Sequence, residues 1–289
     1  MQTSELFEQF KRERRFITNV TAKTLSWYET AWAKFGPFIG EVRNEGELKL
    51  KIKAAMVAMS SQGTLSPESI NTYTRVCQTF INWLHENDVI SKPIKLTRLK
   101  TPKLILETLT DDQIERLIKF VPRTRSQRRI HAATILMLDT GLRASEWLGL
   151  RKENIDFENK QLRVFGKGRK ERLVPISAEC RKALMKWMIR DVPKDAEVIF
   201  CTKAGKKTSQ RNSLRDIKRL GARCGVWKIG LHYCRHSFAS AFIRSGGGVT
   251  DLQKILGHSS ITTTMRYTHS LIGELKIASQ KFSPIARLG

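Results

Sequence analysis

Paired cysteines, long apolar runs and acidic residues are scarce in this 289-residue sequence, and each shortage excludes a class of protein. The five cysteines are an odd number and form no Cys-x-x-Cys pair, so neither a disulfide framework nor a zinc ribbon is indicated. One set of residues could be imagined around zinc, although its spacing matches no common ligand pattern: Cys201, Cys224, Cys234 and His232. We expect reduced thiols, and neither a metal nor a cofactor.

No run of about 18 apolar residues occurs, so a membrane span is not expected. The N-terminus does not resemble a signal peptide, because Glu5, Glu8 and Lys11 interrupt it before an apolar region can form. A hydrophobic content of 40% and a charged content of 27% are typical of a globular chain, and the length allows two domains. We predict a soluble, cytoplasmic protein.

Acidic side chains number 27 against 52 lysines and arginines, which gives a net charge of +25. The charge is uneven, since residues 1–103 carry +6 and residues 104–289 carry +19. A strongly basic chain favours a polyanionic partner, and the abundant one in cytoplasm is nucleic acid. We expect the second part to dominate the contacts to phosphate, and binding to weaken steeply with salt.

The first part of the chain has the pattern of a helical bundle. Ser66 suits an N-cap and Pro67 the first helical turn. Periodicity and cap signals predict helices at 3–18, 22–40, 46–60 and 67–87. These helices form either a plain bundle with solvated lysines or one half of a clamp on DNA. We assign residues 1–90 to this domain.

A basic segment with two prolines and no helical periodicity follows, and we interpret 91–103 as a linker. The remainder, 104–289, is predicted as a second domain. It opens with a capping box, Thr110 with Gln113. Two segments of alternating apolar and polar residues with turn residues between them predict a strand pair, at 161–165 and 171–176. A third strand is expected near 197–201, together with several helices. The fold class is mainly α (α+β), with a small antiparallel sheet.

Six side chains of the second domain suit attack on a phosphodiester: Arg143, Lys167, His232, Arg235, His258 and Tyr267. Such attack needs a nucleophile in line with the leaving oxygen and cations on the other phosphate oxygens. Arginine suits the second task, because its planar fork donates two parallel hydrogen bonds and stays charged. Tyrosine as the nucleophile would form a 3′-phosphotyrosyl link and keep the bond energy for religation.

The remaining members of the set have supporting tasks. Lys167, in a glycine turn, suits protonation of the leaving 5′ oxygen, and Lys170 and Arg169 compete with it for this role. His232 precedes Arg235 by three residues and shares its helical face. Glu146 follows Arg143 by three residues and would orient that arginine or His232.

Each of these residues also has an ordinary structural explanation. Arg143 could be a surface arginine at a helix start, Lys167 could be solvated, and His258 could cap a helix end. Tyr233 lies near Arg235, but it would point away from the helical face that His232 occupies.

Taken together, four stretches resemble the tyrosine recombinase (phage integrase) family: TGLRASEWLGL, GKGRKERLVPI, HYCRHSFAS and LGHSSITTTMRYTH. That family uses Arg, Lys, His, Arg, His and Tyr in this order, and the sequence supplies all six. The resemblance covers residues 104–270 strongly and 1–103 only in outline. Cys234 departs from the family, which commonly has leucine there, and it puts no catalytic residue in doubt.

The resemblance implies a C-shaped clamp made of a core-binding (SAM-like) domain and a catalytic domain. The length suits a simple, Xer-like site-specific recombinase acting in DNA integration, excision or resolution. Its partner would be double-stranded DNA with inverted-repeat core sites. Four protomers would exchange strands through a Holliday junction, whereas the free protein would be a monomer or dimer. A C-terminal helix, 270–282, would dock on a neighbouring protomer or pack on its own domain.

Two other functions stay open at this point, and accessory proteins are possible in any of them. One is a type IB topoisomerase-like enzyme that uses the same site as a monomer. The other is a DNA-binding accessory protein that has lost catalysis.

Overall fold

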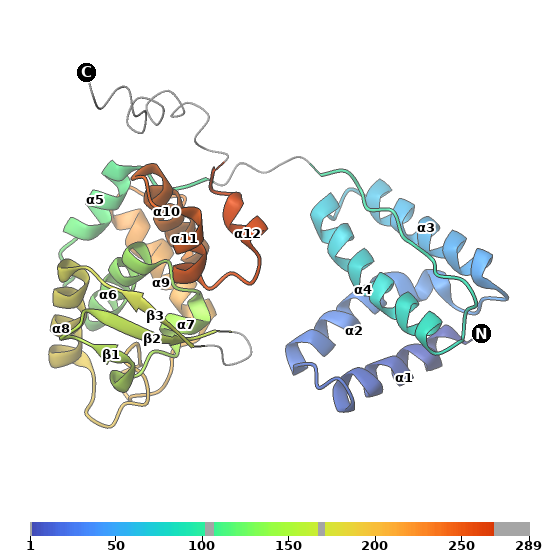
Figure 1. Ribbon diagram of the computed structural model, residues 1–289, viewed down its shortest axis with the longest axis horizontal. Coiled ribbons are helices and arrows are strands. Elements are labelled where there is room, and N and C mark those ends of the chain that lie inside the picture. The colour runs from blue at the N-terminus through green and yellow to red at the C-terminus, as the bar shows by residue number, and fades with distance from the viewer. Residues whose placement is uncertain (1, 102–106, 167–170, 269–289) are drawn as a thin grey trace, which may run out of the picture. The chain divides into compact units, whose positions relative to one another are not determined.

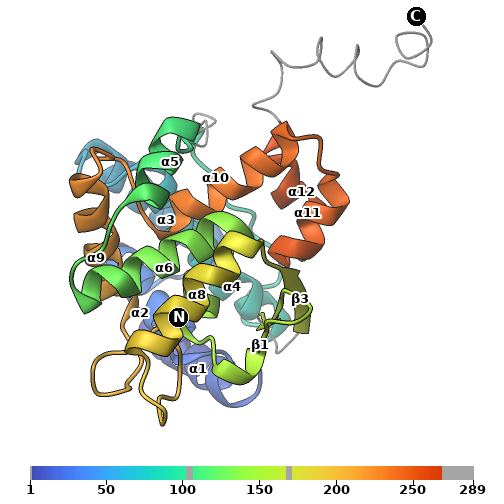
Figure 2. The same ribbon diagram turned by 90° about the vertical axis from the view of Figure 1, so that its left-hand side faces the viewer.

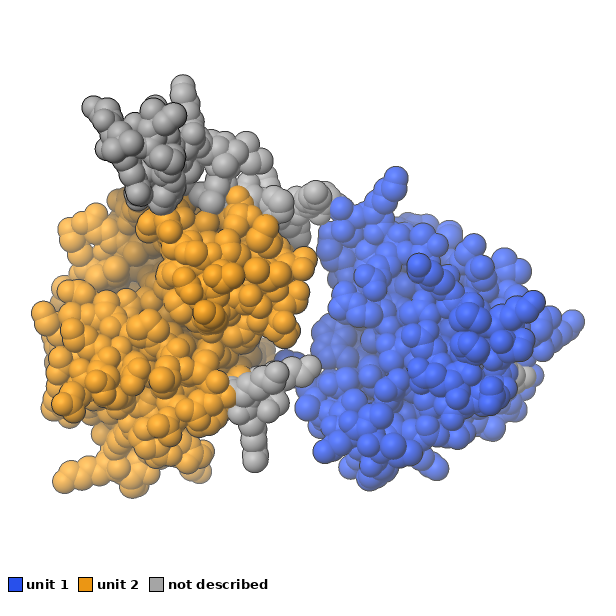
Figure 3. Space-filling view, in the orientation of Figure 1, with its two compact units in different colours: residues 1–104 blue, residues 105–289 orange. Residues whose placement is uncertain are grey.

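The computed structural model describes residues 2–101, 107–166 and 171–268, and the chain divides into two compact units, Met1–Leu104 and Ile105–Gly289 (Figure 3). Lys167, its competitors Arg169 and Lys170, and the predicted docking helix lie outside the described residues. Among the described helices, none is long and apolar enough to cross a bilayer.

Within residues 2–101, the described part of the first unit, there are four helices: α1 (Thr3–Phe16), α2 (Ala22–Ile39), α3 (Glu45–Ser61) and α4 (Pro67–Glu86) (Figure 1). Thr21, Asn44 and Ser66 cap the last three, because each side chain accepts a hydrogen bond from a backbone N–H of the first turn. Phe10 and Phe80 pack together in an apolar core to which all four helices contribute.

The predicted linker is extended as far as it is described, and part of it lies along α4. Ile94 and Leu96 are buried in the core of the first unit. Asn71 exchanges two hydrogen bonds with the backbone of Leu99, at 2.9 and 2.8 Å. Gln78 does the same with the backbone of Ile94 and Leu96, at 2.8 Å each. Side chains of α4 thus take the place of a neighbouring strand for this segment.

The second unit is mainly helical with one small sheet, which confirms the predicted fold class (Figure 2). Its strands pair antiparallel in the order β1-β2-β3, and Leu162 and Val174 face each other in the buried layer. The elements are α5 (Asp111–Lys119), α6 (Arg125–Thr140), α7 (Ala144–Leu148), η1 (Lys152–Asn154), β1 (Ile155–Asp156), β2 (Gln161–Phe165), β3 (Glu171–Pro175), α8 (Ala178–Asp191), α9 (Gln210–Arg223), α10 (Leu231–Arg244), α11 (Val249–Leu256) and α12 (Ile261–Met265).

The prediction of a strand near 197–201 is wrong. Its apolar side chains are buried as a strand's would be, yet only Cys201 makes an isolated bridge, to Lys207. The backbone of Ile199 instead donates to the carbonyl of Leu150, and its own carbonyl accepts from the indole of Trp187. The apolar run therefore reports burial correctly, but no strand lies beside it to complete a ladder.

Helix α6 is the central helix of the second unit, with α8, α9 and α10 packed against it. It begins with a capping box of Thr124 and Gln127 and ends at Gly141, whose φ is +63°. A Cβ on Gly141 would lie 2.5 Å from Phe238, so only glycine fits this end. The short α7 follows directly, and the carbonyl of Gly141 before it accepts a hydrogen bond from Arg235 of α10.

Candidate active site

Arg143 stands at the N-cap of α7, where Glu146 binds it twice. One carboxylate oxygen accepts from the Arg143 backbone N–H at 2.7 Å and the other from its guanidinium at 3.0 Å. A second guanidinium nitrogen donates to the carbonyl of Gly257 at 2.8 Å. The Arg143 side chain keeps 35% of its surface exposed. It is therefore held in one place and still open to a ligand.

Arg172 of β3 completes the support of Glu146. Its fork donates to both carboxylate oxygens at 2.9 Å, and its Nε donates to the carbonyl of Ile255 at 2.7 Å. Burial alone would raise the pKa of the Glu146 carboxyl, but the hydrogen bonds and charges of Arg172 and Arg143 hold it below its ordinary value. Glu146 is thus an anion between two arginines, and of its two expected partners, Arg143 and His232, its described contacts include Arg143.

Arg235 lies on α10 and is almost fully buried, with 4% of its surface exposed. Its guanidinium donates to the carbonyls of Gly141 at 2.6 Å and Leu256 at 2.9 Å, and to Nε2 of His258 at 2.8 Å. Burial and then the charge of Arg143 lower its pKa to about 10. The guanidinium of Arg235 therefore stays charged at neutral pH, and no carboxylate among the described residues lies within bonding distance of it. A bound anion would offset the free-energy cost of this buried charge.

His258 follows Gly257, which ends α11 in the left-handed conformation with φ of +63°. Because arginine can only donate, Nε2 of His258 accepts from Arg235, and Nδ1–H donates to the hydroxyl of Thr264 at 2.9 Å. Burial and then the charge of Arg235 lower the imidazole pKa to about 4. The ring is therefore neutral at neutral pH, and both of its nitrogens are engaged.

Tyr267 comes one turn after Thr264, directly after α12, and only 4% of its surface is exposed. Its hydroxyl lies 2.9 Å from Nδ1 of His236 on α10. Burial raises the phenol pKa, against the opposing charges of Arg235, Arg266 and Arg143. Tyr267 therefore lies within electrostatic reach of both predicted clamp arginines, and in this state its phenol is protonated.

His232, the other predicted histidine, is exposed near the start of α10. Its ring stacks one turn before that of His236, with 6.4 Å between the centroids. Tyr233, considered above as a rival nucleophile, directs its hydroxyl to Glu107 at 3.1 Å, away from His236 and Tyr267. The structure therefore brings Arg143, Arg235, His258 and Tyr267 together and places His232 at their edge.

Two residues of this site are absent from the sequence prediction. His236 could have been found as the second member of a His-x-x-x-His pair, since residues four apart share a helical face. Arg172 gives no comparable signal, because its contact with Glu146 joins β3 to α7. In the part of the chain that is described, no cluster of histidine, cysteine and acidic residues could hold a metal ion.

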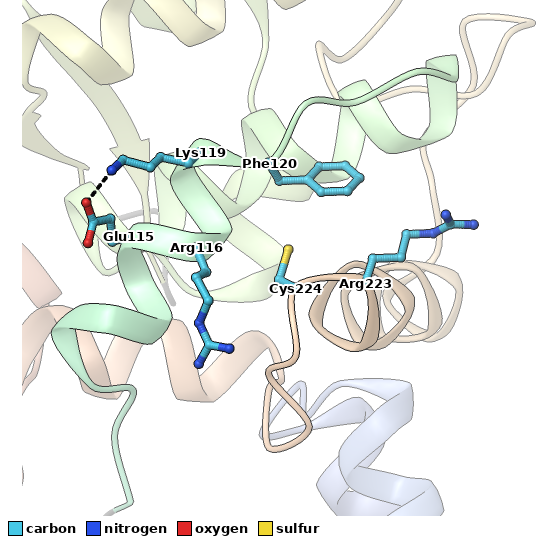
Figure 4. A pocket seen from close by; sticks show the side chains of 6 residues that line it. All are labelled: Glu115, Arg116, Lys119, Phe120, Arg223 and Cys224. Carbon is cyan, nitrogen blue, oxygen red and sulfur yellow. Dashed lines mark ion pairs between the residues drawn. The ribbon is translucent and has the colours of Figure 1, made fainter.

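A separate hollow of about 410 Å³ lies between α5 and the end of α9 (Figure 4). It is lined by Glu115, Arg116, Lys119, Phe120, Arg223 and Cys224. Glu115 pairs with Lys119 at 2.5 Å along α5, on one wall of the hollow. None of the predicted site residues lines this hollow, so it is not part of the site built around Arg235.

Comparison with known proteins shows the family of this chain. Residues 107–273 match the phage integrase family. Tyrosine recombinase XerC of Xanthomonas campestris pv. campestris (strain B100) is 32% identical over 274 residues, which cover 92% of this chain and 84% of that protein. XerC of Escherichia coli O157:H7 is 30% identical over 245 residues, covering 82% of each.

Two solved structures share the fold. The Tn1549 transposon integrase in complex with a circular intermediate DNA has a TM-score of 0.79 at 21% identity and covers 96% of this chain and 99% of that one. A lambda integrase dimer bound to a COC′ core site has a TM-score of 0.75 at 17% identity, with coverages of 92% and 95%. The chain belongs to the phage integrase family. It is a tyrosine-type site-specific recombinase, which confirms the enzyme class that its motifs predict.

Proposed function

We propose that this chain cuts one strand of duplex DNA by attack of the Tyr267 hydroxyl on a phosphodiester between the forks of Arg143 and Arg235. The O–P bond to tyrosine forms, the bond to the 5′ oxygen breaks, and the DNA 3′ end stays on the protein. Attack by the 5′ hydroxyl of another strand reverses the step and joins the new partners. No cofactor is needed, because the tyrosyl ester keeps the bond energy.

The observation that carries the proposal is the convergence of two guanidinium groups on one turn of backbone. Arg143 donates to Gly257 and Arg235 donates to Leu256, which are neighbours in the chain. Arg235 is buried without a carboxylate within bonding distance in the described structure, and a phosphate would supply the missing charge. Positioned cations of this kind stabilise the charge that develops on phosphoryl oxygens in the transition state.

The other predicted residues have supporting roles in this proposal. Glu146 positions Arg143, and His258 positions Arg235 through the bond to Nε2. Lys167, which lies in the sequence between β2 and β3, would protonate the leaving 5′ oxygen. His232 would bind the phosphate from the edge of the site when DNA covers it.

At the level of assembly we propose that residues 1–90 bind the core site as a separate domain, joined through 91–103 to the catalytic domain, 104–289. Similar solved structures include the XerH site-specific recombinase bound to a palindromic difH substrate and a lambda integrase dimer bound to a COC′ core site, which supports a DNA partner here. We further propose inverted-repeat core sites, a homotetramer during strand exchange through a Holliday junction, and docking of 270–282 on a neighbour. Cytoplasmic localisation stays a prediction.

The experiment is covalent trapping on nicked duplexes tiled across the DNA that flanks the coding sequence, followed by a denaturing gel. A nick just downstream of the scissile phosphate lets the short fragment with the free 5′ hydroxyl diffuse away, so the protein stays on the 3′ end of the remaining strand. Tyr267→Phe should abolish the adduct. Tyr233→Phe is the matched control, because that hydroxyl bonds Glu107 outside the site. Equal adduct from wild type and Tyr267→Phe would refute the assignment.

A further inference from the structure

His236 is a half-buried histidine that the proposed function leaves without a task. It lies on α10 directly after Arg235, and its Nδ1 is 2.9 Å from the hydroxyl of Tyr267. The two rings lie 5.8 Å apart between centroids, tilted by 46°. The imidazole thus touches the oxygen that the proposed function makes the nucleophile.

No other imidazole of the described site is available to that oxygen. His258 donates through Nδ1 to Thr264 and accepts at Nε2 from Arg235, so both of its nitrogens are taken. His232 stacks on His236 with 6.4 Å between the ring centroids, and the described bond to the Tyr267 hydroxyl comes from His236. The geometry therefore selects His236 from the three histidines.

Charge decides which partner of this bond holds the proton. Burial, followed by electrostatic interactions with His232, Arg235 and Arg266, lowers the pKa of His236 to about 4, so the ring is neutral at neutral pH. A neutral imidazole has one lone pair, and its nitrogen is a better acceptor than a phenol oxygen, whereas the phenol is the better donor. We therefore assign the proton of the bond to Tyr267 and the lone pair to Nδ1.

Substrate binding should raise the pKa of His236, which makes it a better proton acceptor. The groups whose charges act on His236 are His232, Arg235 and Arg266, with neutral His258 beside them. A phosphate between the arginines offsets the positive charges and favours the protonated imidazole. His236 is thus a weak base in the free protein and a stronger one when DNA is in place.

We propose that His236 is the proton acceptor for Tyr267 during strand cleavage. This role of His236 rests on the proposed function, in which Tyr267 is the nucleophile. The phenol oxygen forms its bond to phosphorus while its proton passes to Nδ1, giving an imidazolium with the second proton on Nε2. The electron pair of the broken P–O bond leaves with the 5′ oxygen, which takes its proton from a different acid. Religation returns the proton from His236 to the departing phenol.

The test is the rate of covalent complex formation by His236→Asn in a single turnover on a nicked duplex that the wild type cuts. Asparagine keeps a polar atom near the position of Nδ1 but cannot accept a proton, so the rate should fall about 100-fold, the low end for general-base removal. The matched control is His131→Asn. That histidine is also partly buried with a lowered pKa, but it bonds the carbonyls of Leu117 and Ile118.

A second substrate separates the nucleophile side from the leaving-group side. It carries sulfur in place of the bridging 5′ oxygen, and a thiolate leaves without an acid because its pKa is near 8.5. The defect of His236→Asn should persist on this substrate. Rescue by sulfur would overturn the proposal, and so would rates within threefold of His131→Asn on both substrates. If wild type made no adduct, or Tyr267→Phe still made one, the proposed function itself would fail instead.

A measurement on the free protein guards against a variant that misfolds. Nitrogen-15 spectra of the histidine rings should show Nδ1 of His236 unprotonated at pH 7. Tyr267→Phe should shift that resonance and leave His131 in place. An unmoved His236 signal would show that the bond to Tyr267 does not exist in solution and would overturn the assignment.

Discussion

Replacing Glu146 with glutamine tests how the site tolerates its clustered arginines. The carboxylate is only 3% exposed and receives four side-chain or backbone bonds from Arg143 and Arg172. Glutamine keeps the shape and one acceptor oxygen but removes the only carboxylate that the described structure places among these cations. Breaking a buried pair costs about 3–5 kcal/mol, and the retained amide and the partly exposed Arg143 favour the lower end, about 3 kcal/mol.

The assay should report on the second unit alone, because a protein with two units need not unfold in one step. Hydrogen exchange of the α6 and α10 amides, read by mass spectrometry, gives the opening free energy of that unit. Glu153→Gln is the control, since Glu153 is 71% exposed and its pair with Arg151 spans 3.7 Å. An exposed pair of this kind contributes less than about 1 kcal/mol.

The pH dependence gives a second signature. The pKa of Glu146 is lowered in the folded state, so its stabilisation is present above the unfolded value of 4.5 and is lost as the pH falls through the folded value. The difference between wild type and Glu146→Gln should therefore shrink in acid. Cleavage at pH 7 should fall at least about tenfold, while gel-shift binding stays, because a DNA phosphate replaces the missing anion. Equal stability of Glu146→Gln and Glu153→Gln would refute this reasoning.

Three further predictions concern the same unit. Gly257→Ala should lower the free energy of unfolding by at least about 1 kcal/mol and slow cleavage, because φ is +63° and the new Cβ would lie 2.9 Å from the Arg172 guanidinium. Thermal melting and single-turnover rates check these two effects. Asp216→Asn should destabilise by about 3 kcal/mol, because it removes the partner of Arg129 at 2.7 Å, as hydrogen exchange of α9 would show. Because the pKa of His258 is lowered in the folded state, the free energy of unfolding should fall as the pH drops from about 6.5 towards 4. In His258→Gln, melting curves should show a weaker dependence of stability on pH in this range.

Each of these predictions has a clear contrary result. Unchanged melting of Gly257→Ala would mean that Arg172 moves freely. A loss below about 0.5 kcal/mol for Asp216→Asn would mean that solvent screens the pair. An identical acid slope in His258→Gln would mean that another group titrates in that window.

The helices were predictable because their signals are local. Ser66 and Thr110 cap the helices that the sequence assigns to them. In the helix predicted at 46–60, the apolar side chains at helical spacing are buried: Leu48, Ile52, Ala55 and Met59. The strand near 197–201 was not predictable from its apolar run, because burial alone does not distinguish a strand from a buried loop. What decides is the partner, and here the backbone of Ile199 bonds Leu150.

The site was predictable in its residue types and less so in its contacts. Motif order identified Arg143, Arg235, His258 and Tyr267, and the structure brings these four together. The position of His236 against Tyr267 depends on the turn after α12, which no local pattern specifies. Contacts between side chains about 30 residues apart need the fold, since His236 on its helix and Tyr267 in its turn carry no local sign of each other.

The most direct test of the account is to digest the trapped protein–DNA adduct and sequence the peptide that carries the nucleotide. If Tyr267 is the nucleophile, there should be a single modified peptide, with the 3′ phosphate of the DNA esterified to the Tyr267 oxygen, and no adduct in Tyr267→Phe. An adduct on Tyr233 or on any other side chain would contradict it.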